Sequence, residues 1–407
     1  IFVVHHEFFN QKITSITHHQ ASNIKHQTSI NMQPIKILQI FTVLNKGGAE
    51  TNLMNYYRNM DRSQFQIDFL VHRETGFFEE ELIKSGSKIF RLPAILPWKL
   101  KEYKNAVKNF FEEHNDYDII HGQCSELGVF IYEEAKRRGI PVIIAHAHNN
   151  RMDRDKKLVF RLMWKKRMRK SINAYFTCGK EAAENLFGKN LARHSYQMNN
   201  AIEVEDFQFN QEVREKKRKG LQAEETINLV NIGRFNTQKN QSFLLEVFAE
   251  LIKRNKKYKL FLVGQGELES QLREKAKQLK IERDVAFLGL RNDVPELLQA
   301  MDLFLFPSLH EGFSVAFVEA QTTDIKAVIS DGVPTESILI PENVTVIPLK
   351  NSAQQWAEKI AEIHNFERKN VAALIKEKGY DIKENAQKLE KKYKELVKQN
   401  KIKTSTS

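Results

Sequence analysis

The sequence of 407 residues has no apolar run that approaches the roughly 20 residues needed to span a bilayer, so it predicts no transmembrane helix. Only two cysteines are present, Cys124 and Cys178, and both stand in apolar surroundings without a CxxC pair. We expect buried, reduced thiols, which favour a cytoplasmic protein over an oxidised, secreted one. The GxGxxG fingerprint is also missing, and this disfavours dinucleotide chemistry.

Residues 1–31 lack the features of a signal peptide, because their apolar part is too short and no small-residue cleavage site follows. The segment is polar and precedes Met32, and we expect it to be disordered or an upstream extension of the reading frame. No cluster of Cys or carboxylates supports a metal site at its histidines, which are His5, His6, His18, His19 and His26.

Positive charge, in contrast, is abundant. A net charge of +12 attracts phosphate, whether on nucleic acid, on an anionic membrane or on a small substrate, and charge alone does not choose among these. The composition, 41% hydrophobic and 28% charged, is that of a globular protein long enough for two domains of roughly 180 residues each.

Short apolar runs alternate with longer amphipathic ones, first from Lys36 to about residue 210 and again from residue 226. Such alternation predicts an α/β protein of two doubly wound, Rossmann-like domains that face a central cleft. The predicted strands lie near residues 36–41, 66–71, 88–92, 117–121, 141–146 and 173–178, and then near 227–232, 259–263, 285–289, 302–306, 327–330 and 344–348.

These strands place the first domain at residues 32–210 and the second at residues 226–380. The charged stretch 211–225 between them is predicted to be a linker or an exposed edge. The final segment, residues 381–407, contains a helical pattern near 383–399 that could pack on either domain.

The most informative stretch is residues 307–321, where seven residues separate Glu311 from Glu319 and Gly312 follows the first. A strand precedes it and helical spacing follows, so Glu311 is expected at the loop tip and Glu319 within the helix. The rise of a helix puts the carboxylates about 10 Å apart. That distance is too wide for a retaining glycosidase pair and at the outer limit of an inverting one. It suits an extended ligand held at both ends, with an anion at the free N–H groups of the helix start.

The same half contains a glycine turn followed by two cations, Gly233, Arg234 and Lys239. Arg binds phosphate as a fork and Lys as a point charge, so beside the Glu pair they are predicted to neutralise a diphosphate rather than to line an ordinary polar loop. Gly264 lies in a GxG turn for which a purely structural role is at least as good an explanation. Leu290 follows the next strand, where backbone amides could meet a base edge, and we include both residues in the predicted site.

In the first half, Gly47 and Gly48 open a helix after the first strand, and paired glycines let the backbone approach a bulky anion. The fifth strand ends with His146 and His148. A His at a strand end faces the cleft, whereas one within a strand is usually core. His148 is therefore the better candidate for contacting substrate, and a hydrogen-bonded loop histidine is the alternative.

Residues 151–170 combine about ten cations with apolar residues and Trp164. This is a basic amphipathic helix suited to an anionic membrane surface, and a solvated helix with an ordinary core face explains it equally well. No recognition helix or aromatic sheet motif accompanies the charge, so we expect no nucleic acid partner.

With these motifs assembled, the chain resembles the family-4 (group 1) retaining glycosyltransferases of the GT-B fold, especially those that build bacterial capsular, exopolysaccharide or lipopolysaccharide chains. The resemblance runs from Met32 to the C-terminal helix. It is carried by the E-x7-E element from Glu311 to Glu319 and by a Gly-Arg-x4-Lys element formed by Gly233, Arg234 and Lys239.

The resemblance implies a role for each matched residue. Arg234 and Lys239 would hold the donor diphosphate, Glu319 would bind the ribose hydroxyls, and Glu311 would contact the donor sugar. The remaining roles are phosphate capping by the amides near Gly312, Phe313 and Ser314, closure over the donor by Gly47 and Gly48, and a position near the sugar for His148 or His146.

The family works without a metal ion, and no Asp-x-Asp motif is present here. The resemblance thus implies no cofactor, a nucleotide-sugar donor that is most readily UDP-linked, and a lipid-linked or growing glycan acceptor at the cytoplasmic membrane face. Two alternatives stay open. One is a nucleotide-sugar epimerase, and the other is a basic peripheral membrane or nucleic-acid binding protein with a relict donor site.

Two places depart from the family pattern. Thr323-Asp324 stands where the family has Cys-Gly or Ala-Gly after the helix, and we expect Asp324 to adopt the left-handed conformation with local strain. Asn200-Ala201-Ile202-Glu203 stands where the family has Asn-Gly-Ile-Asp, which predicts an altered geometry between the domains.

Overall fold

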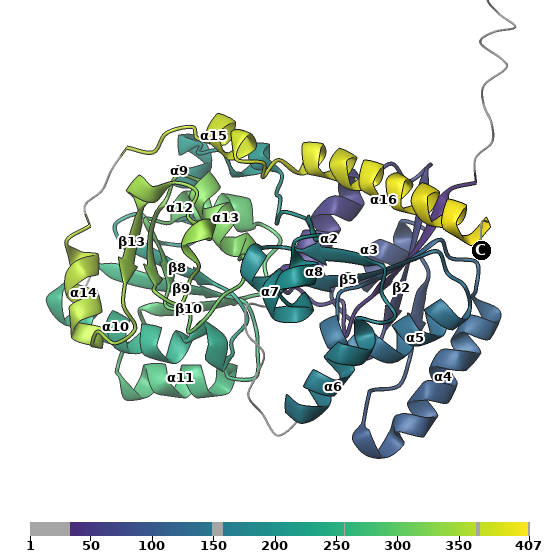
Figure 1. Ribbon diagram of the computed structural model, residues 1–407. Helices are drawn as coiled ribbons and strands as arrows, with labels where there is room; N and C mark the ends of the chain where they lie inside the picture. Colours follow the sequence, from purple (N-terminus) through teal and green to yellow (C-terminus); the bar gives the residue numbers. More distant parts are fainter. Residues whose placement is uncertain (1–32, 149–157, 256, 364–366, 406–407) are drawn as a thin grey trace, which may run out of the picture.

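The computed structural model describes residues 33–148, 158–255, 257–363 and 367–405, and the predicted extension 1–31 lies outside these ranges. Two parallel sheets with helices on both faces follow each other along the chain (Figure 1). The first sheet has the strand order β3-β2-β1-β4-β5-β6-β7 and the second has the order β10-β9-β8-β11-β12-β13. The predicted fold class, two doubly wound α/β domains, is confirmed.

In the first domain, every predicted strand is present, and one short strand that was not predicted, β7, is added at the sheet edge. Its strands are β1 (Ile35–Ile40), β2 (Phe65–Val71), β3 (Ile89–Arg91), β4 (Ile119–Gly122), β5 (Val142–Ala147), β6 (Ala174–Thr177) and β7 (Tyr196–Gln197). Its helices are α2 (Gly48–Asn59), α3 (Glu79–Lys84), α4 (Leu100–Glu113), α5 (Val129–Arg137), α6 (Leu158–Met168), α7 (Lys180–Phe187) and α8 (Lys189–Ala192).

The second domain contains all six predicted strands. They are β8 (Ile227–Ile232), β9 (Tyr258–Val263), β10 (Val285–Gly289), β11 (Leu303–Phe306), β12 (Lys326–Ser330) and β13 (Val344–Ile347). The helices that follow the first domain are α9 (Gln211–Gly220), α10 (Gln241–Arg254), α11 (Glu269–Gln278), α12 (Val294–Ala300), α13 (Val315–Thr322), α14 (Ala353–Ala361), α15 (Ala372–Glu377) and α16 (Ile382–Ser405). Strand β11 is apolar and buried at every position, because helices cover both faces of a parallel sheet.

The stretch 211–225, predicted as a linker or an exposed edge, instead begins with helix α9 of the second domain. The side chain of Asn210 caps this helix by accepting from the backbone N–H of Val213 at 3.1 Å. Arg214 and Arg218 both pair with Asp302 and also donate to backbone carbonyls at the end of α12. The charges that suggested a linker therefore hold α9 against α12.

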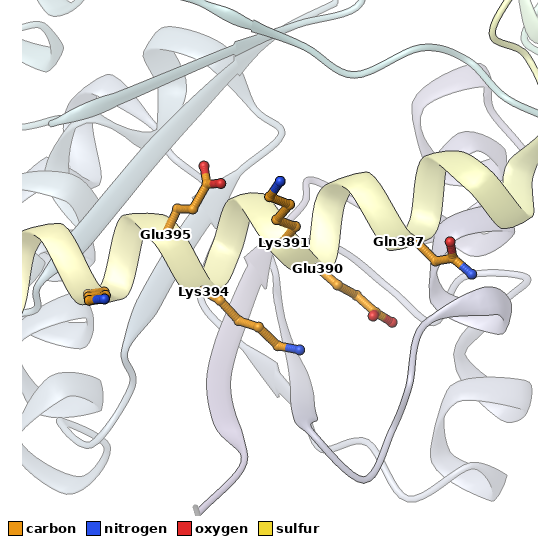
Figure 2. A pocket seen from close by; sticks show the side chains of 6 residues that line it. Gln387, Glu390, Lys391, Lys394 and Glu395 are labelled. Carbon is orange, nitrogen blue, oxygen red and sulfur yellow. The ribbon is translucent and has the colours of Figure 1, made fainter.

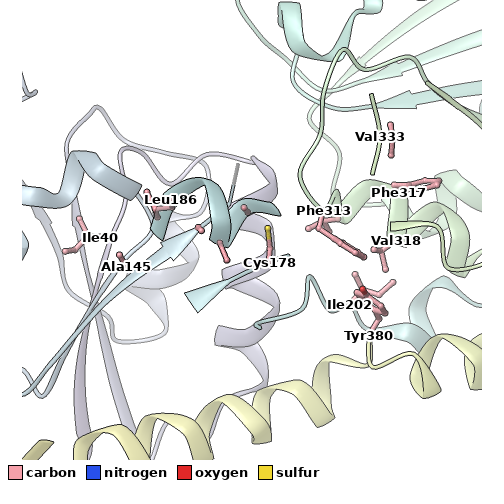
Figure 3. Packing of buried hydrophobic residues seen from close by; sticks show 14 of the residues in the cluster. Ile40, Ala145, Cys178, Leu186, Ile202, Phe313, Phe317, Val318, Val333 and Tyr380 are labelled. Atoms are coloured by element: carbon pink, nitrogen blue, oxygen red, sulfur yellow. The ribbon is translucent and has the colours of Figure 1, made fainter. Parts of the chain in front are cut away.

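The chain crosses between the domains twice, and the two crossings lie side by side. The backbone N–H of Ile202 donates to Tyr380 at 3.0 Å, and the N–H of Ile382 donates back to Ile202 at 3.0 Å. Phe313 stacks on Tyr380 with 5.2 Å between ring centroids. One apolar cluster runs through this junction from the first domain to the second, with Cys178 opposite Phe313 (Figure 3).

After the second crossing, α16 packs on the first domain (Figure 1). The sequence had left open which of the two domains this helix covers. Its buried residues recur at the spacing of one helix face. The opposite face carries charged and polar side chains that fan out from the helix (Figure 2). The buried apolar residues of α16 are Ile382, Ala386, Leu389, Tyr393, Leu396 and Val397.

Asp324 adopts the left-handed conformation that was predicted for it, with φ at 54°. Its carboxylate accepts from the side-chain amide of Asn343 at 2.5 Å and from the backbone N–H of Lys369 at 2.6 Å. These bonds offset the strain of a non-glycine residue at this turn.

Because α16 belongs to the core of the first domain, Leu389→Ala should destabilise the protein by about 2–5 kcal/mol, the range for deleting a fully buried Leu side chain. Urea denaturation measures the effect. Lys388→Ala on the exposed side of the same turn removes only the surface pair with Glu384 and should cost about 0.5 kcal/mol or less. Equal shifts in the two variants would contradict the placement of α16.

Candidate functional site

The two strongest motifs of the second domain meet at one sheet edge. Strand β8 leads to the glycine turn and β11 leads to the Glu311 loop, and these strands are neighbours in the sheet. The ammonium of Lys239 lies 2.8 Å and 3.0 Å from the two carboxylate oxygens of Glu311 and 4.6 Å from the centre of the Phe306 ring. The exposed fractions of the Lys239 and Glu311 side chains are 16% and 5%, so water screens this ion pair only weakly.

The GxG turn packs directly under the glycine turn after β8. Gly264 has φ at 135°, and a Cβ atom there would lie 2.1 Å from the carbonyl oxygen of Gly233. A Cβ atom at Gly266 would lie 2.2 Å from the carbonyl oxygen of Phe235. Both glycines therefore let the two loops touch, and this supports the structural explanation of the GxG turn.

Glu319 lies in α13, the helix that follows the Glu311 loop. Burial raises the pKa of its carboxyl to about 7, and the ammonium of Lys46 in the first domain opposes this shift. The N-cap residue of α13, Ser314, makes no side-chain capping bond, so the side chain leaves the N–H groups of the helix start for an anion. Gly312 lies in the same loop. Phe313 is turned toward the first domain, where its carbonyl accepts from the Asn200 side chain.

The glycine loop of the first domain reaches across to the second domain. The ammonium of Lys46 donates to the carbonyl of Arg291 and to the side-chain oxygen of Asn292, the latter at 2.7 Å. Burial lowers the pKa of Lys46, and the carboxylate of Glu319 opposes this. Leu290 precedes the loop that Lys46 contacts, so this predicted site residue lies at the domain interface.

Glu50 forms the second electrostatic link across the cleft. Burial raises the pKa of its carboxyl to about 7, while its own backbone N–H and the guanidinium of Arg234 pull it down. A Cβ atom at Gly47 would lie 2.4 Å from a carboxylate oxygen of Glu50, whereas a Cβ atom at the exposed Gly48 would meet no atom within 4 Å. Glycine at position 47 thus leaves room for this carboxylate.

Arg234 is the charged residue of the site whose side chain is most free to move toward a ligand, because it is 64% exposed. It pairs with the exposed carboxylate of Glu267 at 3.1 Å. An exposed pair of this kind contributes little free energy, so a bound anion can recruit the guanidinium at small cost.

The two predicted histidines are stacked, with 4.1 Å between ring centroids. His146 is fully buried inside β5, whereas His148 follows the strand and is half-buried. Burial lowers the pKa of His148 to about 4 and the pKa of His146 well below its ordinary value, with the nearby histidines adding to the shift at His146. Both rings are therefore neutral near pH 7, and His148 is the one at the cleft edge.

Several residues at the site were not predicted as functional from the sequence. Lys46 and Glu50 flank the predicted glycine pair, so the glycine motif was the sequence feature that could have pointed to them. His121 and Gln123 lie at the end of β4, which is the neighbour of β5 in the sheet. Their position beside His146 and His148 follows from this strand order, which the local sequence does not show. Tyr393 on α16 has no local signal either, since its hydroxyl contacts His121 in the interior of the domain across 272 residues of sequence.

Helix α6 has several apolar side chains that are exposed to solvent instead of packed in the core. Val159 is 75% exposed and Phe160 is 52% exposed, and Leu162 and Met163 are about half exposed. Trp164 and Met168 pack inward, so the helix has both a core face and an apolar outer surface. The first half of the predicted basic helix, residues 151–157, lies outside the described residues.

Other candidate features contribute nothing to the cleft. A depression of about 350 Å³ follows the outer face of α16 (Figure 2), where Lys394 bonds Gln64 at the start of β2, the sheet edge opposite the site. Among the residues that the structure describes, no three His, Cys, Asp or Glu side chains are grouped to hold a metal ion. In the same ranges, none of the helices combines the length and apolarity required to cross a membrane.

Two protein-family models match the chain, one for each domain. The model of glycosyl transferases group 1 matches residues 212–389, and the model of glycosyltransferase family 4 matches residues 46–205. Together the two matches reach from the first glycine loop into α16.

Curated relatives match over most of the chain. EpsF of Bacillus subtilis (strain 168), named as a glycosyltransferase, is 32% identical over 371 residues, which cover 88% of this chain and 95% of EpsF. The UDP-Gal:alpha-D-GlcNAc-diphosphoundecaprenol alpha-1,3-galactosyltransferase of Escherichia coli is 24% identical over 310 residues, which cover 73% of this chain and 79% of that enzyme.

Among solved structures, Anabaena HepE in complex with UDP and glucose aligns with a TM-score of 0.68 at 18% sequence identity. The alignment covers 92% of this chain and 100% of that chain. Such a likeness shows the fold, and it confirms the predicted GT-B arrangement of two doubly wound domains around a cleft.

The shielded carboxyl of Glu319 should make the stability of the protein depend on pH. The pKa of this carboxyl is about 7 in the folded protein, against an ordinary value of 4.5, so the folded state holds the proton more tightly. Stability therefore falls as the pH rises from 4.5 to about 7. Glu319→Gln removes this titration, so its free energy of unfolding should fall less over the interval, by on the order of 1–2 kcal/mol. Urea denaturation at several pH values measures both slopes.

The matched control is Glu274→Gln, because the side chain of Glu274 is 60% exposed on α11. This variant should keep the wild-type dependence of stability on pH. If Glu319→Gln also keeps the wild-type dependence, its carboxyl does not titrate as described.

Proposed function

This chain belongs to the group 1 glycosyltransferases of family 4, and from that premise we propose that it transfers a sugar, with retention of configuration, from a UDP-sugar to a lipid-linked or growing glycan acceptor. The name of the Escherichia coli relative supports the proposed UDP donor and a diphosphoundecaprenol-linked acceptor. The UDP complex of HepE agrees with this choice of nucleotide.

The observation that carries the proposal is the buried pair of Lys239 and Glu311 beside the uncapped start of α13. Glu311 holds the ammonium in place, and the helix start adds N–H groups, so a diphosphate there would meet preorganised positive charge. Arg234 lies on the same loop and can swing from Glu267 to the phosphates. Glu319, which lies further along α13, is proposed to accept hydrogen bonds from the ribose hydroxyls.

In the proposed reaction, the bond between C1 of the sugar and the diphosphate oxygen breaks while the acceptor oxygen bonds to C1 from the same face. Lys239 and Arg234 stabilise the negative charge that grows on the departing diphosphate, which takes up the proton of the acceptor hydroxyl. Lys46 and Glu50 keep the first domain closed over the donor, and closure excludes the water that would otherwise hydrolyse it. We propose that the reaction requires no metal ion.

Thermal-shift screening against UDP-, GDP- and ADP-sugars identifies the donor, because a ligand stabilises the folded state by mass action. Transfer is then measured as UDP release with membrane extract as the acceptor source, and NMR of the product gives the anomeric configuration. Inversion would contradict the retaining mechanism. Turnover without acceptor would support an epimerase, and no turnover with any donor would contradict the proposed function.

Arg234→Gln should weaken UDP binding by about tenfold, the loss expected for one charge-assisted contact to phosphate. Isothermal titration calorimetry with UDP measures the change. The side chain is 64% exposed, so the variant should fold normally. Arg273→Gln is the matched control, since this exposed guanidinium pairs with Glu269 on α11. Equal affinities in the two variants would remove Arg234 from the diphosphate site.

We also propose that the basic, apolar outer surface of α6 holds the enzyme on an anionic membrane, at the inner face of the cell membrane where a lipid-linked acceptor would be found. The exposed apolar residues would enter the headgroup region, and the neighbouring cations would meet acidic lipids. A net charge of +12 agrees with this attraction.

Leu162→Ser combined with Met163→Ser should reduce binding to vesicles of anionic phospholipid by about tenfold or more, because two apolar anchors are lost. Vesicle sedimentation measures binding, and added salt should weaken it further. Ile83→Ser changes an exposed apolar residue on α3 and should bind as wild type does. Equal binding by all three proteins, or preference for DNA over vesicles, would contradict the membrane proposal.

A further inference from the structure

A chain of polar side chains runs through the interior of the first domain and ends at His148. It links three strands of the sheet with α16, and most of its members are inaccessible to solvent. Buried polar groups cost free energy unless they are hydrogen-bonded, so the order of bonds in this chain is constrained. The members are Gln39 on β1, His121 and Gln123 on and after β4, His146 and His148 on and after β5, and Tyr393 on α16.

The first half of the chain runs from His148 to the tyrosine. Nε2 of His148 lies 2.7 Å from the side-chain oxygen of Gln123, which can only accept, so Nε2 must carry the proton. The amide nitrogen of Gln123 donates to the side-chain oxygen of Gln39 at 3.0 Å. The amide nitrogen of Gln39 donates to the hydroxyl of Tyr393 at 3.4 Å.

The second half continues from the tyrosine back toward the cleft. The amide nitrogen of Gln39 can only donate, so the proton of the Tyr393 hydroxyl is assigned to its other partner, Nδ1 of His121, at 2.7 Å. Nε2 of His121 therefore carries a proton and donates to Nδ1 of His146 at 3.3 Å. Nε2 of His146 is then an N–H group, and it is buried with no hydrogen-bond partner. The ring of His146 stacks on His148, which closes the loop of contacts.

All the hydrogen bonds point in one direction, and Tyr393 is the member that joins the two halves. Its hydroxyl accepts from one amide and donates to one imidazole, so it sets the direction of protons on both sides. Nε2 of His146, at the far end of the chain, is buried without a hydrogen-bond partner, so no further contact at this end sets the direction.

We propose that Tyr393 is a positioning residue for the transfer reaction: through Gln39 and Gln123 on one side and His121 and His146 on the other, it holds His148 with the proton on Nε2 and the lone pair on Nδ1. His148 stands just beyond the carboxyl end of β5, the sheet edge at which α/β domains bind their ligands. Its Nδ1 is then the acceptor for a hydroxyl group of the bound sugar or of the acceptor glycan. The effect of Tyr393 on the rate of transfer rests on the proposed glycosyltransferase function, whereas its effect on the His148 tautomer does not.

The experiment reads the tautomer directly. In protein labelled with ¹⁵N-histidine, two-bond ¹⁵N–¹H correlation spectra should show wild-type His148 with a protonated Nε2 and an unprotonated Nδ1. Tyr393→Phe removes the hydroxyl and should give His148 shifts averaged between the two tautomers. Gln39→Met breaks the first half of the chain without a substitution in α16 and should have the same effect.

Tyr57→Phe is the matched control. Tyr57 is another buried tyrosine of the first domain, and its hydroxyl bonds Ser85 at 2.6 Å and Ser87 at 2.8 Å, away from the histidines. This variant loses a buried hydroxyl of the same kind and should leave the His148 signals unchanged. Thermal melting of all variants separates loss of fold from loss of tautomer control.

In transfer assays, Tyr393→Phe should lower kcat by about threefold to tenfold, the range for loss of a single hydrogen bond, while the Kd of UDP stays as in the wild type. A wild-type His148 protonated on Nδ1, or Tyr393→Phe spectra that match those of Tyr57→Phe, would overturn the proposal. If no donor is turned over by the wild type, the proposed function fails, but the spectra still decide the role of Tyr393.

Discussion

The double crossing between the domains is the constraint on which the site depends. Ile202 bonds Tyr380 on one side and Ile382 on the other, and the stacked pair of Phe313 and Tyr380 packs against it, so the two carboxyl-terminal sheet edges face each other at close range. Only in this arrangement can Lys46 reach the loop after β10, and Glu50 approach Arg234. A cleft assembled from two domains thus behaves as one electrostatic unit.

Within that unit, most of the charged groups are at least partly shielded from water. Glu50 and Glu319 titrate near pH 7, while Lys239 is held by Glu311 and Lys46 by backbone and side-chain oxygens. Desolvating a charge costs free energy, and groups with strongly shifted pKa values cluster at functional sites. An anionic ligand that enters between Lys239 and the start of α13 meets dipoles and charges that need no rearrangement, which is the condition for electrostatic stabilisation of a leaving group.

The C-terminal helix ties this unit to the outer surface of the first domain. Its apolar face completes the core, and the hydroxyl of Tyr393 enters the polar chain behind His148. Sequence spacing placed a helix near residues 383–399 but left its packing open, because a single amphipathic stripe fits either domain. The prediction of a linker at 211–225 is wrong for a related reason. The sequence does not show that Arg214 and Arg218 pair with Asp302 next to the end of α12, so by itself it predicts that both are solvated charges.

Local sequence by itself determined the α/β alternation, the strand positions, the E-x7-E element and the left-handed turn at Asp324, because each depends on periodicity or on the backbone preferences of a few adjacent residues. Tertiary structure alone decided that Gly264 serves loop packing, that His146 is fully buried, and that Lys46 and Glu50 complete the site. Burial, ion pairing and the direction of a hydrogen-bonded chain depend on residues far apart in sequence, and no local pattern encodes which of them will meet.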